Sequence, residues 1–245
     1  MPVIVDESAI DEQTRLILVN AVYFKGEWLQ TFDAHATREN DFHVSQTETV
    51  KVQMMYMQKT FYYGESDNIK CQVIELPYVG KIEFLHQWPS MFIILPSQSV
   101  TLAEVEKKLT SDDLMNARER FQMASTEVKL WLPKFQLDEK LSLVEALSGM
   151  GIKDLFVDGA ADLSGVDGSR ELYVSKVLHR AVVDVNEEGT EAAAATAMTY
   201  AVYACILPLK TLPQFRADHP FLFFIQHNAT KSILFLGRLV KPPSA

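Results

Sequence analysis

Two polar side chains stand inside apolar segments, where they could carry chemistry. His179 interrupts the run VLHRAVV, and Lys134 lies in LPKFQL. A single histidine in a strand is more often a hydrogen-bonded core group than a catalyst. A lysine beside apolar residues commonly extends its ammonium to solvent over an apolar stem. Neither residue alone predicts catalysis.

The sequence motifs that would complete a catalytic site are absent. The chain contains no HExxH, CxxC, P-loop or GxGxxG motif. In SGMG the serine and glycines stand in the wrong order for a nucleophile elbow. No group of residues supplies a nucleophile, a base and an oxyanion donor together. We therefore expect no enzyme activity, no catalytic residue, no metal site and no cofactor.

The composition narrows the class of protein and its partners. The chain has 245 residues, 48% apolar and 22% charged, with a net charge of −9, which is ordinary for a soluble globular protein. No apolar stretch approaches the roughly 18 residues of a membrane span, and no Lys/Arg cluster is interleaved with aromatics. Neither a membrane nor a nucleic acid is an expected partner. Of the two cysteines, Cys71 borders an apolar run and is expected to be buried, and Cys205 is expected to be exposed.

The elements that must position Lys134 and His179 are mainly strands. The patterns predict a 14–24 strand buried on both faces, a β pair over 41–58, and short strands within 62–78 and 83–96. They also predict a strand from residue 126 in which Pro133 marks a bulge or the end, a long 171–189 strand and a 219–243 hairpin. One or two helices are expected over 99–121, a helix stopped by Gly149 or Gly151 over 141–156, and a loop over 159–169. This order predicts one α+β domain over 1–245, without doubly wound alternation.

A segment of small residues follows the 171–189 strand. VNEEGTEAAAATAMTYAVYA (185–204) passes through Gly189 and then has no large side chain before Met198. Alanine favours helix, and Thr190 could cap one, but the segment lacks the apolar stripe that would dock a helix. In an extended chain alternate residues share a face, and small ones could enter between packed strands. A solvent-exposed helical loop and a latent strand both fit.

VNEEGTEAAAATA resembles the reactive-centre-loop hinge of inhibitory serpins. LVNAVYFKGEW, LPKF, DLSGV, LYVSKVLHRA and HPFLFFI…ILFLGRLVKP resemble further serpin segments in the same order, so the resemblance covers nearly the whole chain. It implies three β-sheets with a reactive-centre loop at about 187–210, and a suicide-substrate inhibitor. A serine or cysteine protease attacks the loop, which then inserts as a central strand of the large sheet and traps the acyl-enzyme.

The resemblance also implies roles for individual residues. Trp28, Lys134 and Glu187 match the region where insertion begins, and Glu187 is expected to pair with Lys134. Asn20 and His179 match the region through which the sheet opens, where a hydrogen bond between them would hold the closed form. The hinge residues are Gly189, Thr190, Glu191, Ala192, Ala193, Ala194, Ala195 and Thr196.

Family spacing from Gly189 implies a scissile bond between Tyr203 and Ala204. Tyr203 favours a protease with an apolar S1 pocket, such as a chymotrypsin-like enzyme, whereas a cysteine cathepsin could read Val202. Leu207, Leu209 and Lys210 are alternative sites, and cleavage at Lys210 would imply a trypsin-like target.

The chain is shorter than serpins usually are. Helices and two strands of the large sheet that precede the 14–24 strand in the family are expected to be missing, either because this is a fragment, because they lie in another chain, or because the protein is a short form. The 14–24 strand would then expose a sheet edge and an apolar face, and a short form could fail to insert its loop. A non-inhibitory serpin-like binding or structural protein is the alternative function.

Further expectations concern the setting of the protein. An extracellular location is expected, with a signal peptide upstream, and the cytoplasm is the alternative. Asn228 begins the sequon Asn-Ala-Thr and is a possible glycosylation site, although an ordinary hairpin turn fits equally well. The expected state is a monomer that could form loop–sheet polymers. The acidic balance makes a glycosaminoglycan partner unlikely.

Overall fold

The computed structural model describes residues 4–5, 10–79, 88–188 and 211–242. The chain divides into two compact units. Unit 1 comprises Met1–Phe24 and Gln136–Asp184, and unit 2 comprises Lys25–Phe135 and Val185–Ala245. The single domain predicted over 1–245 stays a prediction, and each unit is described by itself.

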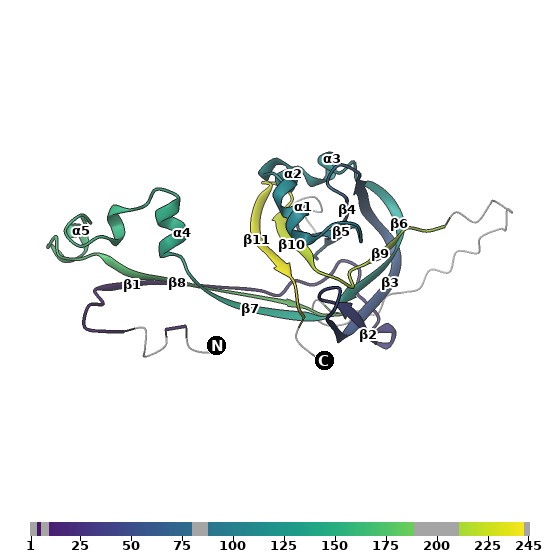
Figure 1. Cartoon of the computed structure of the whole chain (residues 1–245), viewed down its shortest axis with the longest axis horizontal. Helices are drawn as coiled ribbons and strands as arrows, with labels where there is room; N and C mark the ends of the chain where they lie inside the picture. Colours follow the sequence, from purple (N-terminus) through teal and green to yellow (C-terminus); the bar gives the residue numbers. More distant parts are fainter. Residues whose placement is uncertain (1–3, 6–9, 80–87, 189–210, 243–245) are drawn as a thin grey trace. The chain divides into compact units, whose positions relative to one another are not determined.

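Unit 1 is built on a three-stranded sheet in the order β1-β8-β7. Its strands are β1 (Leu16–Phe24), β7 (Phe135–Ser142) and β8 (Val174–Val185), and they run side by side in Figure 1. β1 and β8 are parallel, with Leu16 opposite Val174 and Phe24 opposite Val183. The predicted long strand is confirmed as β8. At Pro133 the sequence predicted a bulge or the end of a strand; the strand ends there, and β7 begins as a new strand at Phe135.

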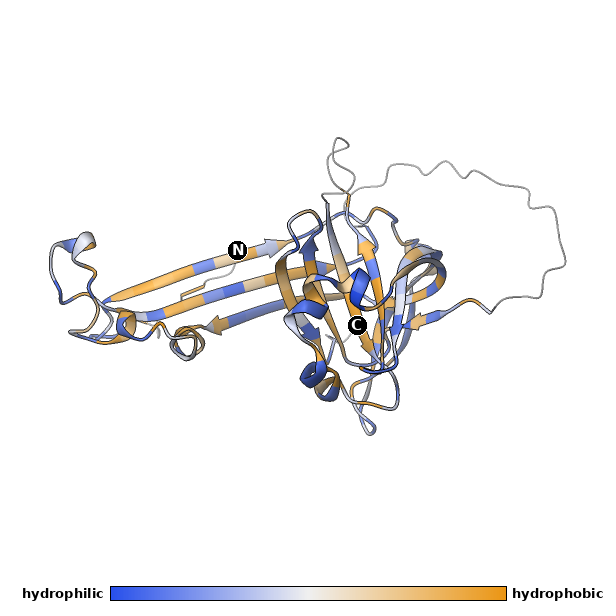
Figure 2. Cartoon of the chain, turned by 90° about the horizontal axis from the view of Figure 1, so that it is seen from above, coloured by the Kyte–Doolittle hydropathy of each residue, from blue (hydrophilic) through white to orange (hydrophobic). Residues whose placement is uncertain are grey.

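The strand predicted over 14–24 is confirmed as β1, but its predicted burial on both faces is wrong. Leu18, Val19 and Tyr23 are 43%, 47% and 59% exposed. Figure 2 colours most of β1 as hydrophobic. Within the described residues this strand is hydrogen-bonded to β8 alone, so neither its outer edge nor its faces are fully covered. The exposed edge and apolar side chains that were also predicted for this strand are present.

Short helical segments connect β7 to β8. Helix α4 (Val144–Gly149) ends at the predicted stop, and Gly151 follows with a φ of +103°, a left-handed value that favours glycine. The predicted helix does not continue to residue 156, where a 3-10 turn (Asp154–Phe156) stands instead. The predicted 159–169 loop contains one helical turn, α5 (Ser164–Asp167).

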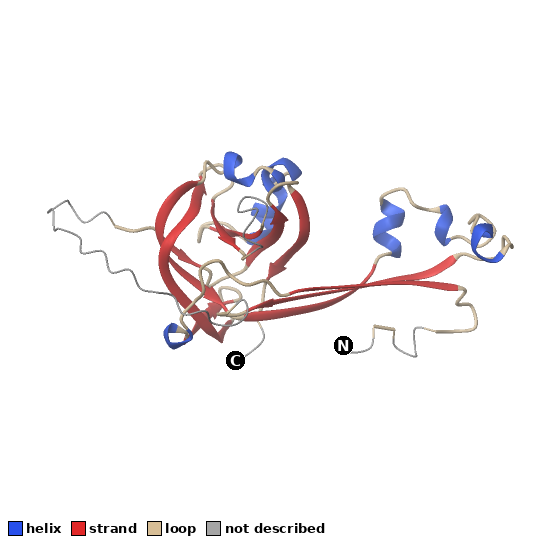
Figure 3. Cartoon of the chain, turned by 180° about the vertical axis from the view of Figure 1, so that it is seen from behind, coloured by secondary structure: helices blue, strands red, loops and turns tan. Residues whose placement is uncertain are grey.

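Unit 2 is an eight-stranded sheet in the order β11-β10-β5-β4-β3-β6-β9, with β2 paired to β3. The strands curve around a common interior in Figures 1 and 3. The predicted β pair, the strand ended by Pro133 and the C-terminal hairpin are confirmed. The strands are β2 (Arg38–His43), β3 (Thr49–Ser66), β4 (Cys71–Pro77), β5 (Pro89–Pro96), β6 (Ala124–Pro133), β9 (Gln214–Arg216), β10 (Phe221–His227) and β11 (Ser232–Leu239).

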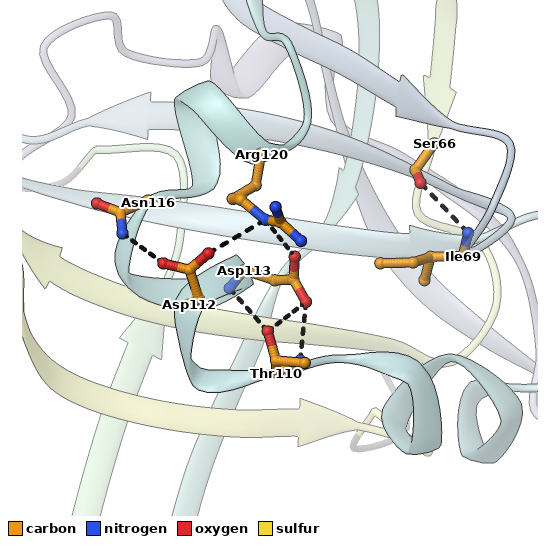
Figure 4. Close-up of polar contacts among 7 residues, drawn as sticks. All are labelled: Ser66, Ile69, Thr110, Asp112, Asp113, Asn116 and Arg120. Carbon is orange, nitrogen blue, oxygen red and sulfur yellow. Dashed lines mark hydrogen bonds and ion pairs between the residues drawn. The ribbon is translucent and has the colours of Figure 1, made fainter.

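Three short helices pack on one face of this sheet. They are α1 (Leu102–Lys108), α2 (Ser111–Met115) and α3 (Ala117–Arg120), where one or two helices were predicted. Thr110 forms a second capping box with Asp113, which starts a new helix soon after α1 ends. Asp113 also accepts a 2.9 Å hydrogen bond from Arg120, as Figure 4 shows.

The core between these helices and the sheet contains Cys71, packed with Val73, Phe92 and Ile94. Cys71 is 4% exposed, which confirms the predicted buried thiol. Burial raises the pKa of this thiol to about 12, so it stays protonated and unreactive. Cys205 lies outside the described residues.

Candidate functional site

Glu187, two residues beyond the end of β8, is held by three contacts. Its Oε2 lies 2.7 Å from Lys134 Nζ, and its Oε1 accepts a 2.8 Å hydrogen bond from the Thr37 hydroxyl. Its backbone carbonyl accepts the N–H of Phe32 at 3.1 Å. The predicted pairing of Glu187 with Lys134 is confirmed. The chain that enters the 189–210 segment is therefore fixed at its first end.

The charge state of Glu187 follows from these contacts. Burial alone would raise the pKa of its carboxyl, but the hydrogen bonds from Lys134 and Thr37 outweigh burial and hold the pKa below its usual range. The carboxylate is therefore ionised at neutral pH. Because its side chain is only 10% exposed, loss of Lys134 would leave a poorly solvated charge.

Trp28 contacts the residue that precedes Glu187. Its indole Nε1–H donates to the carbonyl of Asn186 at 2.8 Å. Its ring stacks on Tyr78 with centroids 4.4 Å apart and meets Phe32 edge-on at 6.5 Å. The buried indole thus joins Glu187 in one cluster, which we call the hinge anchor: Trp28, Phe32, Thr37, Lys134, Asn186 and Glu187.

Three members of the hinge anchor, Phe32, Thr37 and Asn186, were not predicted from the sequence; Asn186 takes part through its backbone carbonyl. Phe32 takes part through its backbone N–H, which any residue except proline offers. Thr37 follows the 3-10 turn of Ala34–Ala36 and carries no motif that points to Glu187. The pairing of Lys134 with Glu187 and the presence of Trp28 in this region were expected, because these residues lie in segments that resemble a known family; the contact of Trp28 with Asn186 was not predicted.

Asn20 and His179 meet within unit 1. They are register partners in the parallel β1/β8 pair. His179 Nδ1 lies 2.9 Å from the Asn20 side-chain oxygen; since that oxygen can only accept, the ring nitrogen donates. The predicted hydrogen bond is confirmed. His179 is only half-buried, so the structure does not confirm the other interpretation, that it is a core histidine.

A stronger contact joins β8 to β7. Arg180 is 5% exposed; its Nε donates to Asp138 Oδ1 at 2.6 Å, and its Nη2 bonds the other carboxylate oxygen. The hydrogen bonds and charge of Arg180 lower the pKa of Asp138. Sequence analysis missed this pair, since an aspartate in QLDEK gives no sign of its partner.

Several predicted site residues lie outside the described part of the chain. These are the hinge residues Gly189, Thr190, Glu191, Ala192, Ala193, Ala194, Ala195 and Thr196, and the candidate cleavage residues Tyr203, Ala204, Leu207, Leu209 and Lys210. Their roles stay predictions. Beyond this segment the first strand that the structure describes is β9, which pairs in parallel with β6.

The sequon asparagine lies between β10 and β11. The side-chain nitrogen of Asn228, the atom to which a glycan would be joined, donates to the hydroxyl of buried Ser90 at 2.8 Å. Glycosylation of Asn228 stays a prediction.

Within the described residues, no group of three or more His, Cys, Asp or Glu side chains is placed to hold a metal ion. No helix in the same ranges is long and apolar enough to cross a bilayer.

Comparison with known proteins gives consistent matches. The family model described as Serpin (serine protease inhibitor) matches residues 2–242. The chain is 44% identical to leukocyte elastase inhibitor of Equus caballus over 99% of its length, and 46% identical to Serpin B9 of Homo sapiens over 96%. It covers 62% and 60% of those two proteins.

Solved structures agree with these matches. The chain matches the structure of a tumour suppressing serpin at 34% identity with a TM-score of 0.78, covering 96% of this chain and 59% of that one. It matches uncleaved ovalbumin at 32% identity with a TM-score of 0.81, covering 98% and 57%. The fold of the chain is therefore the fold of these proteins over the aligned part.

Proposed function

Because this chain belongs to the serpin family, we propose that it is a suicide-substrate inhibitor of a serine or cysteine protease. The protease cleaves the 189–210 segment, forms an acyl-enzyme and is trapped as the loop inserts between β1 and β8. The family is described as one of protease inhibitors, which supports an inhibitor rather than an enzyme. The observation that carries the proposal is the hinge anchor, which fixes the chain directly before the small-residue segment.

The topology of unit 1 is compatible with such an insertion. β8 continues directly into the loop, so a strand formed by the loop beside β8 would run antiparallel to it. Since β1 is parallel to β8, the new strand would also be antiparallel to β1. One parallel pairing would be exchanged for two antiparallel pairings, which are slightly more stable per residue. The inserted strand would add backbone hydrogen bonds that the uncut form lacks.

The composition of the loop supports rapid entry. From Thr190 to Ala197 no side chain except Glu191 is larger than threonine, so a strand of these residues would enter a packed sheet with little overpacking. About fourteen residues separate Gly189 from the proposed cleavage site, and at roughly 3.3 Å each they would carry Tyr203 some 45 Å. The protease attached to Tyr203 would be displaced by that length.

The proposed scissile bond lies between Tyr203 and Ala204. A tyrosine at this position fits the hydrophobic slot of a chymotrypsin-like S1 pocket. One relative is named for inhibition of elastase, whose S1 pocket is small; such a protease would prefer Val202 or Ala204. Leu207, Leu209 and Lys210 are the remaining sites.

The experiment mixes the chain with chymotrypsin, elastase, trypsin and a cysteine cathepsin. An inhibitor forms a covalent complex that survives SDS, and mass spectrometry of the released peptide identifies the bond. Clean loop cleavage without a complex would favour the alternative, a non-inhibitory serpin-like protein or one whose inhibition is lost because the chain spans under two thirds of its relatives. The monomeric state, loop–sheet polymers and the extracellular or cytoplasmic location stay predictions.

A matched pair of loop variants tests the insertion step. Thr190→Arg places a charged side chain on the strand face that would be buried once the loop has entered the sheet. This variant should behave as a substrate that is cut at the same bond. Glu191→Arg introduces the same side chain one residue later, on the opposite face, and should retain the complex. Equal loss of the complex in both variants would contradict insertion in this register.

A further inference from the structure

A cavity of about 770 Å³ opens in unit 2, and no residue of the hinge anchor lines it. Four segments form its walls: the β2–β3 turn, the start of α1 with the loop before it, the β9–β10 loop and the end of β11. This volume lies within the range of about 300–1,000 Å³ that is usual for small-ligand pockets. Figure 1 shows α1 lying beside β11.

The walls of the cavity combine apolar and polar side chains, as small-ligand sites do. The apolar part comes from Val44, Val100, Leu102, Pro220 and Val240. These side chains are half-buried except Val240, which is 42% exposed. They offer apolar surface that the fold itself leaves partly uncovered, and that the body of a ligand would remove from water.

Arg238 supplies a cation at the edge of this apolar surface. Its Nη1 lies 3.4 Å from both carboxylate oxygens of Glu106, at the far limit for a hydrogen bond. Within the described residues its Nε and Nη2 make no hydrogen bond, and its side chain is 62% exposed. By contrast, Arg118 in the same unit bonds Glu75 with two contacts of 2.6 Å. The Arg238 guanidinium therefore keeps most of its donors for another acceptor.

The other charged groups of the cavity are already neutralised. Asp218 Oδ1 lies 2.9 Å from His219 Nδ1, and the carbonyl of Pro96 lies 2.8 Å from His219 Nε2. Both partners are acceptors, and although burial lowers the pKa of His219, the hydrogen bonds to Asp218 and Pro96 raise it overall, which favours the imidazolium beside Asp218. Asp218 also lies 3.4 Å from Arg216. No uncompensated acid besides Glu106 faces Arg238 from these walls.

We propose that this cavity binds a small amphipathic carboxylate, with its apolar body against Val44, Val100 and Leu102 and its carboxylate on Arg238. A guanidinium and a carboxylate form parallel N–H···O bonds, a geometry that the long Glu106 contact does not achieve. The site is independent of the proposed inhibitory function, since neither the hinge anchor nor the 189–210 loop contributes to it.

The test uses the full chain, labelled at the methyl groups of valine and leucine, and sodium octanoate as the probe. The expected result is saturable shifts of the Val44, Val100, Leu102 and Val240 methyl signals in NMR spectra. The neutral 1-octanol and the cation octyltrimethylammonium should bind more weakly. Equal or tighter binding of the cation, or shifts confined to other methyl groups, would overturn the proposal.

Two variants separate a direct role of Arg238 from a structural one. Arg238→Gln should weaken octanoate binding about tenfold or more, since hydrogen bonds to charged groups commonly contribute that much. Glu106→Gln removes the competing carboxylate and should tighten binding. If both variants weakened binding equally, the Arg238–Glu106 contact would matter only for the shape of the cavity, and the assignment would be wrong. Arg170→Gln, at an exposed ion pair in unit 1, is the matched control and should change nothing.

Discussion

β8 has a neighbour on each edge, and the two edges are held by different chemistry. On the β7 edge, buried Arg180 binds Asp138 through two charge-assisted hydrogen bonds. On the β1 edge, half-buried His179 donates one hydrogen bond to the neutral side chain of Asn20. Charge-assisted bidentate contacts are considerably stronger than single neutral ones. The side chains therefore make β7/β8 the firm edge and β1/β8 the edge that separates at lower cost.

The β1 edge also changes along its length. The loop leaves β8 at the end where Phe24 faces Val183. Asn20 and His179 meet about midway, and contacts from Ser175 and Tyr173 reach the chain just before β1 at the far end. A strand entering from the hinge end would meet the Asn20–His179 bond before those contacts. The order of contacts supports the insertion path proposed above.

The largest expected effect is on the β7 edge. Asp138→Ala removes this carboxylate from Arg180, which is 5% exposed, and a buried charge that loses its partner is destabilising. We expect a fall of several degrees in the melting temperature, measured by circular dichroism. Glu139→Ala changes the next acidic residue of β7 and should have little effect. A double variant, Asp138→Leu with Arg180→Met, should recover stability; failure to recover would show that the charges are not what holds this edge.

Acid should weaken the same edge without a mutation. Arg180 lowers the pKa of Asp138, so the pair contributes stability above the unfolded-state pKa of about 3.9 and loses it as pH falls through the lower folded-state value. Hydrogen exchange at about pH 3 should therefore show faster exchange in β7, relative to β1, than at pH 6. The amide side chain of Asn20 is neutral at both pH values, whereas Asp138 loses its charge in acid. An unchanged ratio would therefore contradict the comparison of the two edges.

A mutation at the β1 edge should change the stability of the protein less, and the rate of loop insertion more, than a mutation at the β7 edge. Asn20→Ala removes one exposed neutral hydrogen bond, worth about 0.5–1 kcal/mol, while easing separation of β1 from β8. Under the proposed mechanism, protease-triggered insertion should accelerate, as followed by stopped-flow fluorescence of a labelled loop. His179→Gln retains a donor and should stay closer to the parent. Slower insertion in Asn20→Ala would show that this contact guides the strand instead of holding the sheet closed.

The two edges also show how far the sequence could be interpreted. Asn20 and His179 were predicted to meet because both lie in segments that resemble serpin motifs, and long apolar runs predicted β1, β8 and the β10–β11 hairpin. The Arg180–Asp138 pair was missed, since its partners are about forty residues apart and follow no spacing rule. The burial of β1 was predicted wrongly, because an apolar pattern records which side chains favour burial and not whether a neighbour covers them.

The hinge anchor divides in the same way. Lys134 and Glu187 were predicted to pair, whereas Thr37 was not, although it contacts the same carboxylate. A hydroxyl at the end of a 3-10 turn has many possible acceptors, and only the folded chain selects one. One or two helices were predicted where the structure has three, and the local sequence explains part of this: a second capping box at Thr110 starts α2 as a separate helix, whereas α3 begins after Asn116 without a side-chain cap.

The smallest expected effect comes from making the β1 edge resemble the β7 edge. Asn20→Asp would place a carboxylate opposite His179, and such an exposed ion pair contributes about 0.2–1 kcal/mol. Insertion should therefore be slower in the variant than in the parent at low ionic strength. Salt should reduce the difference, since exposed pairs are screened. If the variant and the parent inserted at the same rate at every salt concentration, the Asn20–His179 contact would not limit the opening of the sheet, and the weakness of this edge would lie in its backbone pairing alone.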